Sequence, residues 1–337
     1  MNWLALDIGG ANIKIADGLG YAATIPFALW KSPGELSNVL ETILAVAPTG
    51  EHLAVTMTGE LADCFASKTE GVQHIVRHTL VAAGDRSVRF YLHDRTLAPA
   101  ESVLAQPLLA AASNWLALAR FAGRYCEHSS AVLIDIGSTT SDIVPILDGV
   151  PRPMGHSDTQ RLLHGELVYT GVMRSPVCAI VGSFPYRNQF CPVSQELFAT
   201  SRDIYLLLQE LPEDPNCTNT ADSRPATRVH ARQRMARMIC AEPNEFSSDD
   251  ALLAAQFVAR FQLARIAVAL GRVLGRMKRP VEKIIYSGAG EFLGRQLVER
   301  LRLQQVPAVS MSHELGSEVS QCAPAHALAV LAREDYP

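Results

Sequence analysis

The segment LALDIGGANIKIA at residues 4–16 returns in altered form at residues 132–144 as VLIDIGSTTSDIV. Asp7 aligns with Asp135 at an offset of 128 residues (135 − 7), and the glycine two residues later aligns at the same offset. Each copy consists of an apolar stretch, an aspartate, a glycine-containing turn and a second apolar stretch. This pattern predicts a β-hairpin with a polar tip. The repeat therefore predicts a duplicated architecture with one such hairpin in each half.

The tips of the two predicted hairpins have the chemistry of a phosphate site. A glycine-rich tip brings backbone N–H groups close to an anion, and an aspartate at the end of a strand can hold Mg²⁺ directly or through water. Two such tips that face each other across a cleft would form a clamp for a phosphate chain. The predicted phosphate-binding residues are Gly9, Gly10, Ala11, Asn12, Gly137, Ser138, Thr139 and Thr140, and the predicted metal ligands are Asp7 and Asp135.

Lys14 adds a cation to the first hairpin. It lies on the second predicted strand, from which its ammonium group can reach a bound phosphate as a point charge. The alternative is that Lys14 is an ordinary solvated residue of that strand. We treat Lys14 as a candidate catalytic residue together with Asp7 and Asp135.

Length and composition indicate a globular protein with two lobes. At 337 residues the chain is long enough for two domains, which we place at residues 1–125 and 126–337, with a helical insertion near residues 190–245 in the second. Hydrophobic residues make up 48% and charged residues 19% of the chain, as is typical of globular proteins. The net charge of −4 provides no bulk attraction to nucleic acid or to a membrane, and we expect neither as a partner.

The cysteines and the apolar stretches bear on the compartment. Seven cysteines are scattered along the chain with no CxxC pair, which favours reduced thiols and a cytoplasmic location. The N-terminus shows no signal-peptide pattern. The longest apolar stretches are interrupted by arginine or glutamine, as at residues 257–262, so we expect no membrane span.

Hydrophobic periodicity predicts alternating strands and helices. The predicted strands outside the two hairpins span residues 21–30, 53–57, 88–92, 177–181 and 281–286. The predicted helices span residues 34–47, 68–83, 99–122, 228–240, 249–277, 292–302 and 323–333. Strands followed by helices, and then the same order again, predict a duplicated α/β fold.

A third glycine motif follows the strand predicted at residues 281–286. It reads Ser287-Gly288-Ala289-Gly290, and together with the two hairpins it resembles the phosphate and adenosine loops of the acetate kinase/Hsp70/actin superfamily. That resemblance implies a duplicated actin-like ATPase fold, which is ribonuclease H-like, with two lobes and a central cleft for a nucleotide. It indicates the fold and leaves the substrate open.

A narrower resemblance comes from segments outside these loops. They are TMTGELADCF at residues 56–65, ASNW at 112–115, GELVYTGV at 165–172, ELFAT at 196–200, DIY at 203–205 and TAD at 220–222. Together they resemble the hydantoinase A-like proteins linked to tetrahydromethanopterin-dependent one-carbon transfer. Two positions depart from the family pattern. Ser223 replaces an expected glycine, which weakens the case for a positive φ in that turn, and Ser175 replaces an expected threonine while keeping the hydroxyl.

The narrower resemblance implies a transferase in the biosynthesis of methanofuran or methylofuran. In this reaction an aminomethylfuranyl-methyl diphosphate alkylates the phenol of a γ-glutamyltyramine or tyrosine acceptor, and diphosphate leaves. The implied cofactor is Mg²⁺, with ATP not required. The candidate substrate residues from the matching segments are Asn114, Glu166, Tyr169 and Asp203.

The acceptor needs a base because a phenol has an ordinary pKa near 10. Candidate bases are Glu60, Asp63, Glu166 and Asp203, each in or after a polar turn, and the alternative for each is a surface carboxylate. We favour Glu60 as the catalytic carboxylate, since it follows a strand and a glycine. A basic helix with Arg228, Arg232, Arg234 and Arg237 offers another anion site, although a solvated helix face is the simpler interpretation.

Other functions remain open on the sequence. All three superfamily motifs are present, so an ATP-dependent small-molecule kinase or a hydantoinase/oxoprolinase-like ATPase is the main alternative. A non-catalytic nucleotide sensor and an actin-like filament are weaker alternatives. The sequence does not specify the exact acceptor, and a homodimer is compatible with it.

Overall fold

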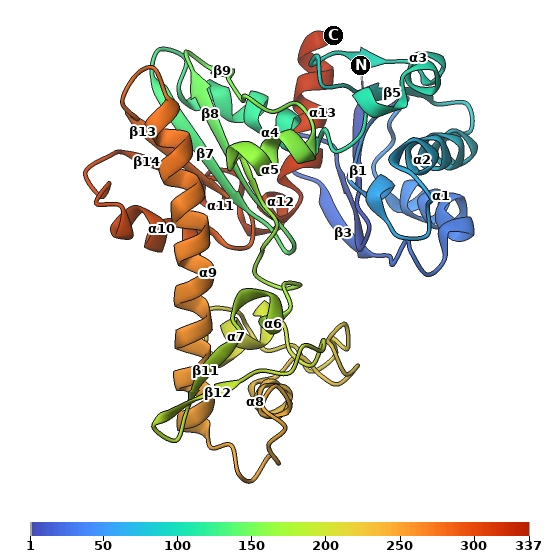
Figure 1. Ribbon diagram of the computed structural model, residues 1–337. Helices are drawn as coiled ribbons and strands as arrows, with labels where there is room; N and C mark the ends of the chain where they lie inside the picture. Colours follow the sequence, from blue (N-terminus) through green and yellow to red (C-terminus); the bar gives the residue numbers. More distant parts are fainter. Residues whose placement is uncertain (1, 337) are drawn as a thin grey trace.

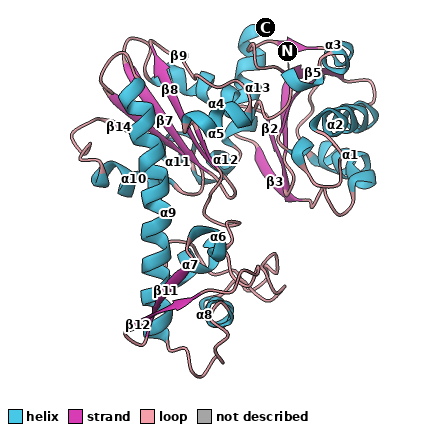
Figure 2. Ribbon diagram, in the orientation of Figure 1, coloured by secondary structure: helices cyan, strands magenta, loops and turns pink. Residues whose placement is uncertain are grey.

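The computed structural model describes residues 2–336 and shows two lobes, each built on its own sheet (Figures 1 and 2). The sheet of the first lobe has the strand order β3-β2-β1-β4-β5-β6. Its strands are β1 (Trp3–Ile8), β2 (Asn12–Ala16), β3 (Ala22–Pro26), β4 (His52–Met57), β5 (Ser87–Tyr91) and β6 (Leu97–Ala98). Helices α1 (Leu36–Val46) and α2 (Lys68–Ala83) bury their apolar faces against it.

The sheet of the second lobe repeats this theme. Its order is β10-β8-β7-β13-β14, with β9 paired to β8. Its strands are β7 (Ser130–Ile136), β8 (Ser141–Leu147), β9 (Val150–Pro151), β10 (Leu167–Val168), β13 (Lys283–Ser287) and β14 (Ala308–Ser310). The long helix α9 (Ser248–Arg276) and helix α10 (Glu291–Arg300) cover one face. The remaining short helices are α3 (Ala100–Ala105), α5 (Asp158–His164), α11 (Met311–Leu315) and α12 (Ser317–Gln321).

The two predicted hairpins are confirmed, and they are built alike. β1 pairs antiparallel with β2, and β7 pairs antiparallel with β8. The Gly9 N–H donates to the Asn12 carbonyl at 3.0 Å, and the Gly137 N–H donates to the Thr140 carbonyl at 2.9 Å. The same turn therefore closes both tips, as the repeat in the sequence requires.

Two helices join the lobes through a shared core. Helix α4 (Asn114–Ala122) and helix α13 (Ala323–Asp335) contribute to one apolar cluster that also includes residues of both sheets, among them Trp3 and Leu133. Although α13 ends the described chain, it packs against β1, β2 and β4 of the first lobe. The second half of the chain thus completes the core of the first.

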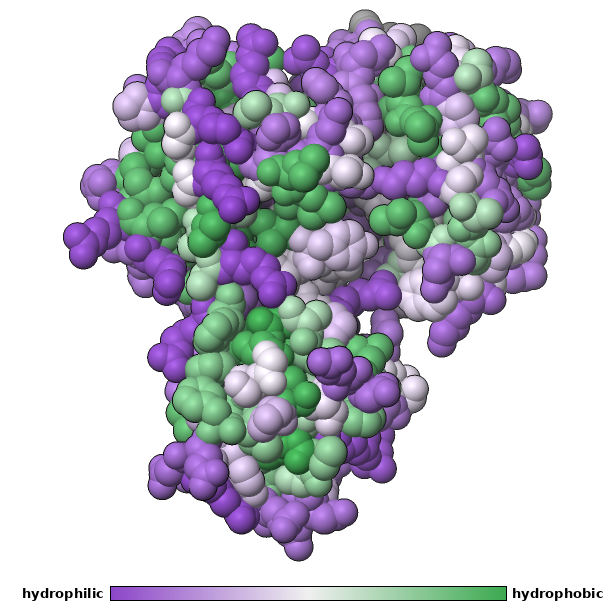
Figure 3. Space-filling model, viewed as in Figure 1, coloured by the Kyte–Doolittle hydropathy of each residue, from purple (hydrophilic) through white to green (hydrophobic). Residues whose placement is uncertain are grey.

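A further subdomain projects from the second lobe around the lower part of α9 (Figure 1). It contains α6 (Val177–Ile180), β11 (Ser183–Tyr186), β12 (Gln189–Pro192), α7 (Ser201–Leu207) and α8 (Arg228–Arg237). It therefore begins before residue 190 and includes a small hairpin besides helices. The space-filling view shows open space between this subdomain and the first lobe (Figure 3).

The structure differs from the sequence predictions at two elements. The single helix expected at residues 99–122 is broken, because Pro107 starts a separate turn and Ala112 takes a positive φ of 48°. Residues 177–180 form a short helix where we expected a strand, since they pack beneath α9 and pair with no other strand.

Two further expectations concern the insertion. Ser223 does adopt a positive φ, of 60°, so the turn keeps the conformation for which glycine was expected. The basic helix α8 is not simply solvated. Arg234 is fully buried and paired with Asp203 and Asp222, and Arg237 also pairs with Asp222. These arginines link segments of the insertion through ion pairs.

Helix α9 is the one helix among residues 2–336 that is long and apolar enough to cross a membrane by length and composition alone. This is weak evidence, because the core helix of a globular protein passes the same test. One face of α9, including Val258, Ile266 and Leu270, is buried in the second-lobe core. Its capping box, formed by Ser247 and Asp250, fixes where it begins.

Shortening a side chain in the shared core should destabilise the whole chain. Leu328 of α13 is fully buried in that core. We expect Leu328→Ala to lower the free energy of unfolding by about 2–5 kcal/mol in urea titrations, because it leaves a cavity. Leu163→Ala is the control, since Leu163 is 74% exposed and its truncation should cost about 0.5 kcal/mol or less. Equal effects of the two substitutions would contradict this role for α13.

Candidate active site at the hairpin tips

Asp7 and Asp135 end equivalent strands and lie in one electrostatic environment. Burial raises the pKa of Asp135 to about 6, and the negative charge of Asp7 contributes in the same direction. Burial also raises the pKa of Asp7, while Lys14 lowers the pKa of both carboxyl groups. Charges influence one another in this way only over short distances. The carboxyl groups of Asp7 and Asp135 therefore lie close to each other.

Lys14 is the cation between the two aspartates. In the strand register it pairs with Asp7, and the equivalent pair in the second hairpin is Asp135 with Asp142. Asp142 is neutralised by Arg161, whose guanidinium lies 2.7 Å from it and 3.8 Å from the centre of the Trp115 ring. The duplication has thus placed a lysine in one hairpin and an ion-paired aspartate at the matching position of the other.

Asn114 lies at the start of α4 and reaches the first aspartate. Its side-chain amide donates to Asp7 Oδ2 at 3.5 Å. The break before α4 makes this possible, because Ser113 is anchored by hydrogen bonds to Thr56 at 2.8 Å and to the Tyr91 carbonyl at 2.9 Å. An uninterrupted helix over residues 99–122 would not give Asn114 this position at a helix start.

A second segment supports the tip at residues 137–140. The N–H groups of Val172 and Met173 donate to the carbonyls of Gly137 and Ser138, both at 3.0 Å. A Cβ on Gly171 would lie 2.5 Å from the Gly137 carbonyl oxygen, so only glycine permits this approach. Gln262 of α9 then fixes the segment by donating to the Gly171 carbonyl at 2.8 Å. Tyr169, just before this segment, is 57% exposed.

The adenosine-type loop packs directly against the second aspartate. Ser287 is the register partner of Asp135 on the adjacent strand. Gly288 has a φ of +84°, and a Cβ there would lie 2.7 Å from Asp135 Oδ1. The Gly290 N–H donates to the Ile136 carbonyl at 2.8 Å. Ser287, Gly288, Ala289 and Gly290 therefore border the same site as the tip at residues 137–140.

Glu60 is a buried carboxylate with no hydrogen-bond partner on either oxygen. It is 1% exposed, and burial raises its pKa to about 7, with a smaller contribution in the same direction from the charge of Asp7. The turn that carries it touches the first tip, since a Cβ on Gly59 would lie 3.2 Å from the Gly9 carbonyl oxygen. Glu60 is thus held beside the tips in a form that can take up or release a proton near neutral pH.

No local sequence pattern predicts several further groups, of which Lys68 and Asp158 lie near Glu60. Lys68 of α2 and Asp158 of α5 form an ion pair that links the two lobes. His93 follows β5 with its Nε2 buried and unpartnered, and burial lowers the pKa of its imidazole. At the edge of the first lobe, the Trp30 ring lies under the guanidinium of Arg174 at 4.8 Å. Contacts between distant segments such as these leave no local pattern in a sequence.

Two predicted substrate residues are not brought to the tips. Glu166 is fully buried and accepts the N–H groups of Met154 and Gly155 at 2.8 and 2.9 Å. Asp203 caps α7 and pairs with buried Arg234 inside the projecting subdomain. Both carboxylates are engaged in holding backbone and side chains in place, so neither serves as a base at the tips. Asp63, another candidate base, is exposed.

The residues at the tips fit a magnesium ion shared with a phosphate. Among residues 2–336, no group of three or more histidine, cysteine, aspartate or glutamate side chains could hold a metal by itself. Mg²⁺ is commonly held by one or two carboxylates, waters and substrate phosphates rather than by a protein cage. Asp7 Oδ1 is buried without a partner, which leaves it free for such a ligand.

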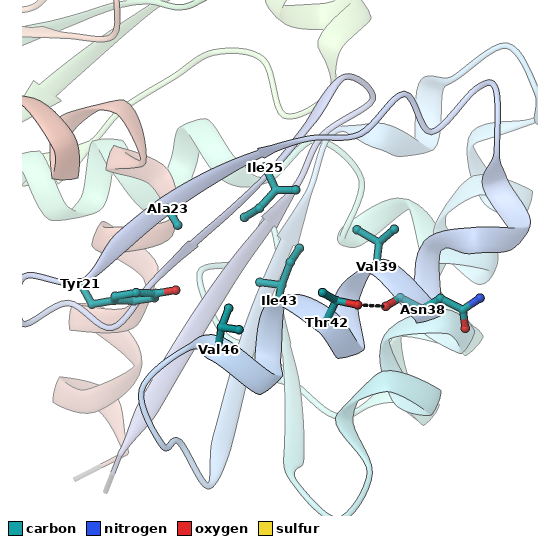
Figure 4. A pocket seen from close by; sticks show the side chains of 8 residues that line it. All are labelled: Tyr21, Ala23, Ile25, Asn38, Val39, Thr42, Ile43 and Val46. Carbon is teal, nitrogen blue, oxygen red and sulfur yellow. Dashed lines mark hydrogen bonds between the residues drawn. The ribbon is translucent and has the colours of Figure 1, made fainter.

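A separate pocket lies away from the tips, between β3 and α1 (Figure 4). It has a volume of about 350 Å³, and its lining includes Tyr21, Ile25, Val39 and Ile43. The lining is mostly apolar and contains no acid, base or cationic group. This pocket offers none of the chemistry found at the hairpin tips.

Comparison with known proteins places the chain in a family. The model of the hydantoinase/oxoprolinase family matches residues 51–334. The chain belongs to the hydantoinase/oxoprolinase family. This hydantoinase-family chain also resembles a solved structure of the PilM–PilN type IV pilus biogenesis complex, with a TM-score of 0.50 and 11% identity, over 100% of this chain and 99% of the other. Such a likeness shows the fold alone. The duplicated actin-like fold with two lobes is confirmed.

Two curated relatives of this hydantoinase-family chain have the same name, (4-{4-[2-(γ-L-glutamylamino)ethyl]phenoxymethyl}furan-2-yl)methanamine synthase. The protein from Methanocaldococcus jannaschii is 29% identical over 331 residues, which is 97% of this chain and 96% of the relative. The protein from Methanococcus vannielii is 28% identical over 212 residues, which is 61% of this chain and 92% of the relative. Both are named as synthases, which supports an enzyme.

Removing the buried acid at position 60 should change how stability depends on pH. The pKa of about 7 in the folded state exceeds the ordinary value of 4.5, so folding becomes less favourable as the pH rises between these values. We expect Glu60→Gln to raise the free energy of unfolding by about 3 kcal/mol at about pH 8, and by much less at about pH 5.

Urea titrations at both pH values measure this difference. Glu41→Gln is the control, because Glu41 is exposed on α1. A gain from Glu60→Gln that is the same at both pH values would show that Glu60 is not the buried titrating group.

Proposed function

We propose that this chain is a transferase that forms the phenoxymethyl–furan ether of methanofuran or methylofuran. The observation that carries the proposal is the similarity to the Methanocaldococcus synthase along 97% of the chain. The name of that relative describes a product in which a phenol oxygen is joined to the methylene group of a furan. This chain would serve tetrahydromethanopterin-linked one-carbon metabolism in the cytoplasm.

The proposed reaction joins two small molecules. The phenol oxygen of a γ-glutamyltyramine or tyrosine acceptor attacks the methylene carbon of an aminomethylfuranyl-methyl diphosphate. A carbon–oxygen bond forms, the bond between the methylene group and the diphosphate oxygen breaks, and diphosphate leaves with both bonding electrons. The phenolic proton passes to a base. The proposed reaction neither consumes nor requires ATP.

The hairpin tips are suited to the leaving group. Asp7, Asp135 and Lys14 lie beside the tips at residues 9–12 and 137–140, so backbone N–H groups of the tips and one ammonium group would be available to phosphate oxygens. When bound between Asp7 and Asp135, Mg²⁺ would neutralise the charge that develops on the diphosphate. Asn114 holds the Asp7 carboxylate in position.

Glu60 is suited to receive the phenolic proton. Its oxygens have no hydrogen-bond partner, and its pKa of about 7 places it between the two protonation states at neutral pH. The exposed ring of Tyr169 offers a surface on which an aromatic acceptor can pack.

One observation favours an ATP-dependent kinase or an oxoprolinase-like ATPase as a second candidate. The loop Ser287–Gly290 is in contact with Asp135, at the position where this superfamily would hold adenosine. An ATPase would use the same tips and the same metal. The two candidates differ in whether turnover requires ATP.

The test of the transferase is diphosphate release. We expect the protein to release diphosphate and form the ether from a furanyl-methyl diphosphate and a tyramine-type acceptor, with Mg²⁺ and without ATP. Asp135→Asn should reduce the rate by about 100-fold or more, because it removes a metal ligand and a charge. Asp85→Asn is the control, since Asp85 is exposed after α2. A strict requirement for ATP hydrolysis would assign the chain to the ATPases instead.

The pH profile tests the base. A base must be ionised, so the rate should rise with pH and level off above about pH 7, following the pKa of Glu60. Glu60→Gln should lower kcat by roughly 100-fold or more and remove this rise, while KM for the diphosphate changes little. An unchanged profile in the variant would exclude Glu60 as the base and leave the transferase proposal standing.

A further inference from the structure

An apolar stripe runs along the solvent side of α9, the helix that extends down the molecule in Figure 1. We call it the α9 seam, and it consists of Leu253, Phe257, Phe261, Ala264, Val268, Gly271 and Gly275. From Phe257 onward the steps alternate between four and three residues, which is the spacing of a coiled-coil seam. Phe261 is 50% exposed and Val268 is 59% exposed.

Apart from Phe257, which also packs against the second-lobe core, the seam is distinct from the face that α9 uses inside the protein. Val258, Ile266, Leu270 and Val273 are buried against the second-lobe core, so the helix is apolar on two sides. A helix that is apolar all round is normally buried on all sides. Beside the seam, Phe190 of β12 is also exposed and packs against Phe257 with ring centres 5.4 Å apart. Apolar surface of this kind follows the lower part of α9 in Figure 3.

The bulky first half of the seam would fit against the small second half of another copy that runs in the opposite direction. The first half is bulky, with Leu253, Phe257 and Phe261, and the second half is small, with Val268 and two glycines. An antiparallel copy of α9 would set Phe257 against Val268 and Leu253 against the first of those glycines. Small side chains contribute little to binding a lipid surface, whereas they allow a second helix to approach closely.

The charges at the two ends of α9 also favour an antiparallel arrangement. Asp249 lies in the first turn of α9, and the exposed Arg272 lies near its end. Asp250 caps the helix and Arg276 is bonded to the His164 carbonyl and to Glu166, so Asp249 and Arg272 are the end charges open to a second copy. Antiparallel pairing brings the acidic start of each helix to the basic end of the other, and the helix dipoles also align favourably. A two-fold axis that generates such a pair creates two identical sets of contacts.

From these complementarities we infer that the α9 seam binds a second copy of this chain, through antiparallel packing of the two α9 helices. The hairpin tips belong to the two sheets and not to α9, so the dimer does not depend on the proposed reaction.

The test is the oligomeric state of the full chain at micromolar concentration, measured by sedimentation velocity. We expect a dimer. Val268→Asp should raise its dissociation constant by roughly 100-fold or more, because a charge is buried in the seam. Val229→Asp is the matched control, since Val229 on α8 is 60% exposed and outside the seam, and its dimer should match the wild type. Circular dichroism checks that both variants are folded.

The orientation has its own test. Arg272→Glu should weaken an antiparallel dimer by about fivefold at low salt, because it faces acidic residues of the second copy. A parallel dimer would set position 272 against itself, so the charge reversal would leave its stability unchanged and overturn the antiparallel arrangement.

Three other outcomes would overturn the inference. A wild-type monomer at micromolar concentration excludes a second copy as the occupant. A dimer that survives Val268→Asp forms elsewhere. A monomer that floats with anionic phospholipid vesicles, and loses this binding on Val268→Asp, assigns the seam to a membrane surface.

Discussion

The fold depends on the packing of two helices between two sheets. Helices α4 and α13 share one apolar core with both sheets, and α13 comes from the far end of the chain. This core fixes where the end of β1 lies relative to the end of β7. Because each of these ends carries an aspartate, the same packing brings Asp7 and Asp135 close together. The site is therefore a consequence of how the lobes are joined.

The carboxyl groups near the hairpin tips are buried and have few oppositely charged neighbours. Asp7 and Asp135 have raised pKa values, Glu60 has a pKa of about 7 with no partner, and Lys14 is the nearby cation. Elsewhere the protein pairs its buried charges, as with Arg234 and Asp203 or Arg161 and Asp142. A group of buried carboxyls without ion-pair partners costs stability, and such costs are concentrated at functional sites. We interpret this contrast as the mark of the active site.

Sequence reasoning predicted the structure well where the information was local. The repeat predicted both hairpins, with Asp7 and Asp135 at the ends of matching strands, since a hairpin tip is specified by a few neighbouring residues. It was less successful with single polar residues. Glu166 and Asp203 are carboxylates of the kind found in active sites. In the structure, however, Glu166 accepts a backbone N–H group and Asp203 pairs with Arg234. Whether a carboxylate meets a substrate or an internal partner depends on residues far away in the chain, as does the position of His93.

The sequence by itself determined the duplication, the order of strands and helices, and the two hairpins with glycine turns, because each of these follows from local pattern and spacing. Only the tertiary structure decided that Asp7 and Asp135 lie close together, that Glu60 is left without a hydrogen-bond partner, and that α13 completes the core of the first lobe. It also decided that α9 keeps an apolar face toward solvent. These properties arise from contacts between distant segments, and the free energy of such contacts depends on burial, which no local pattern records.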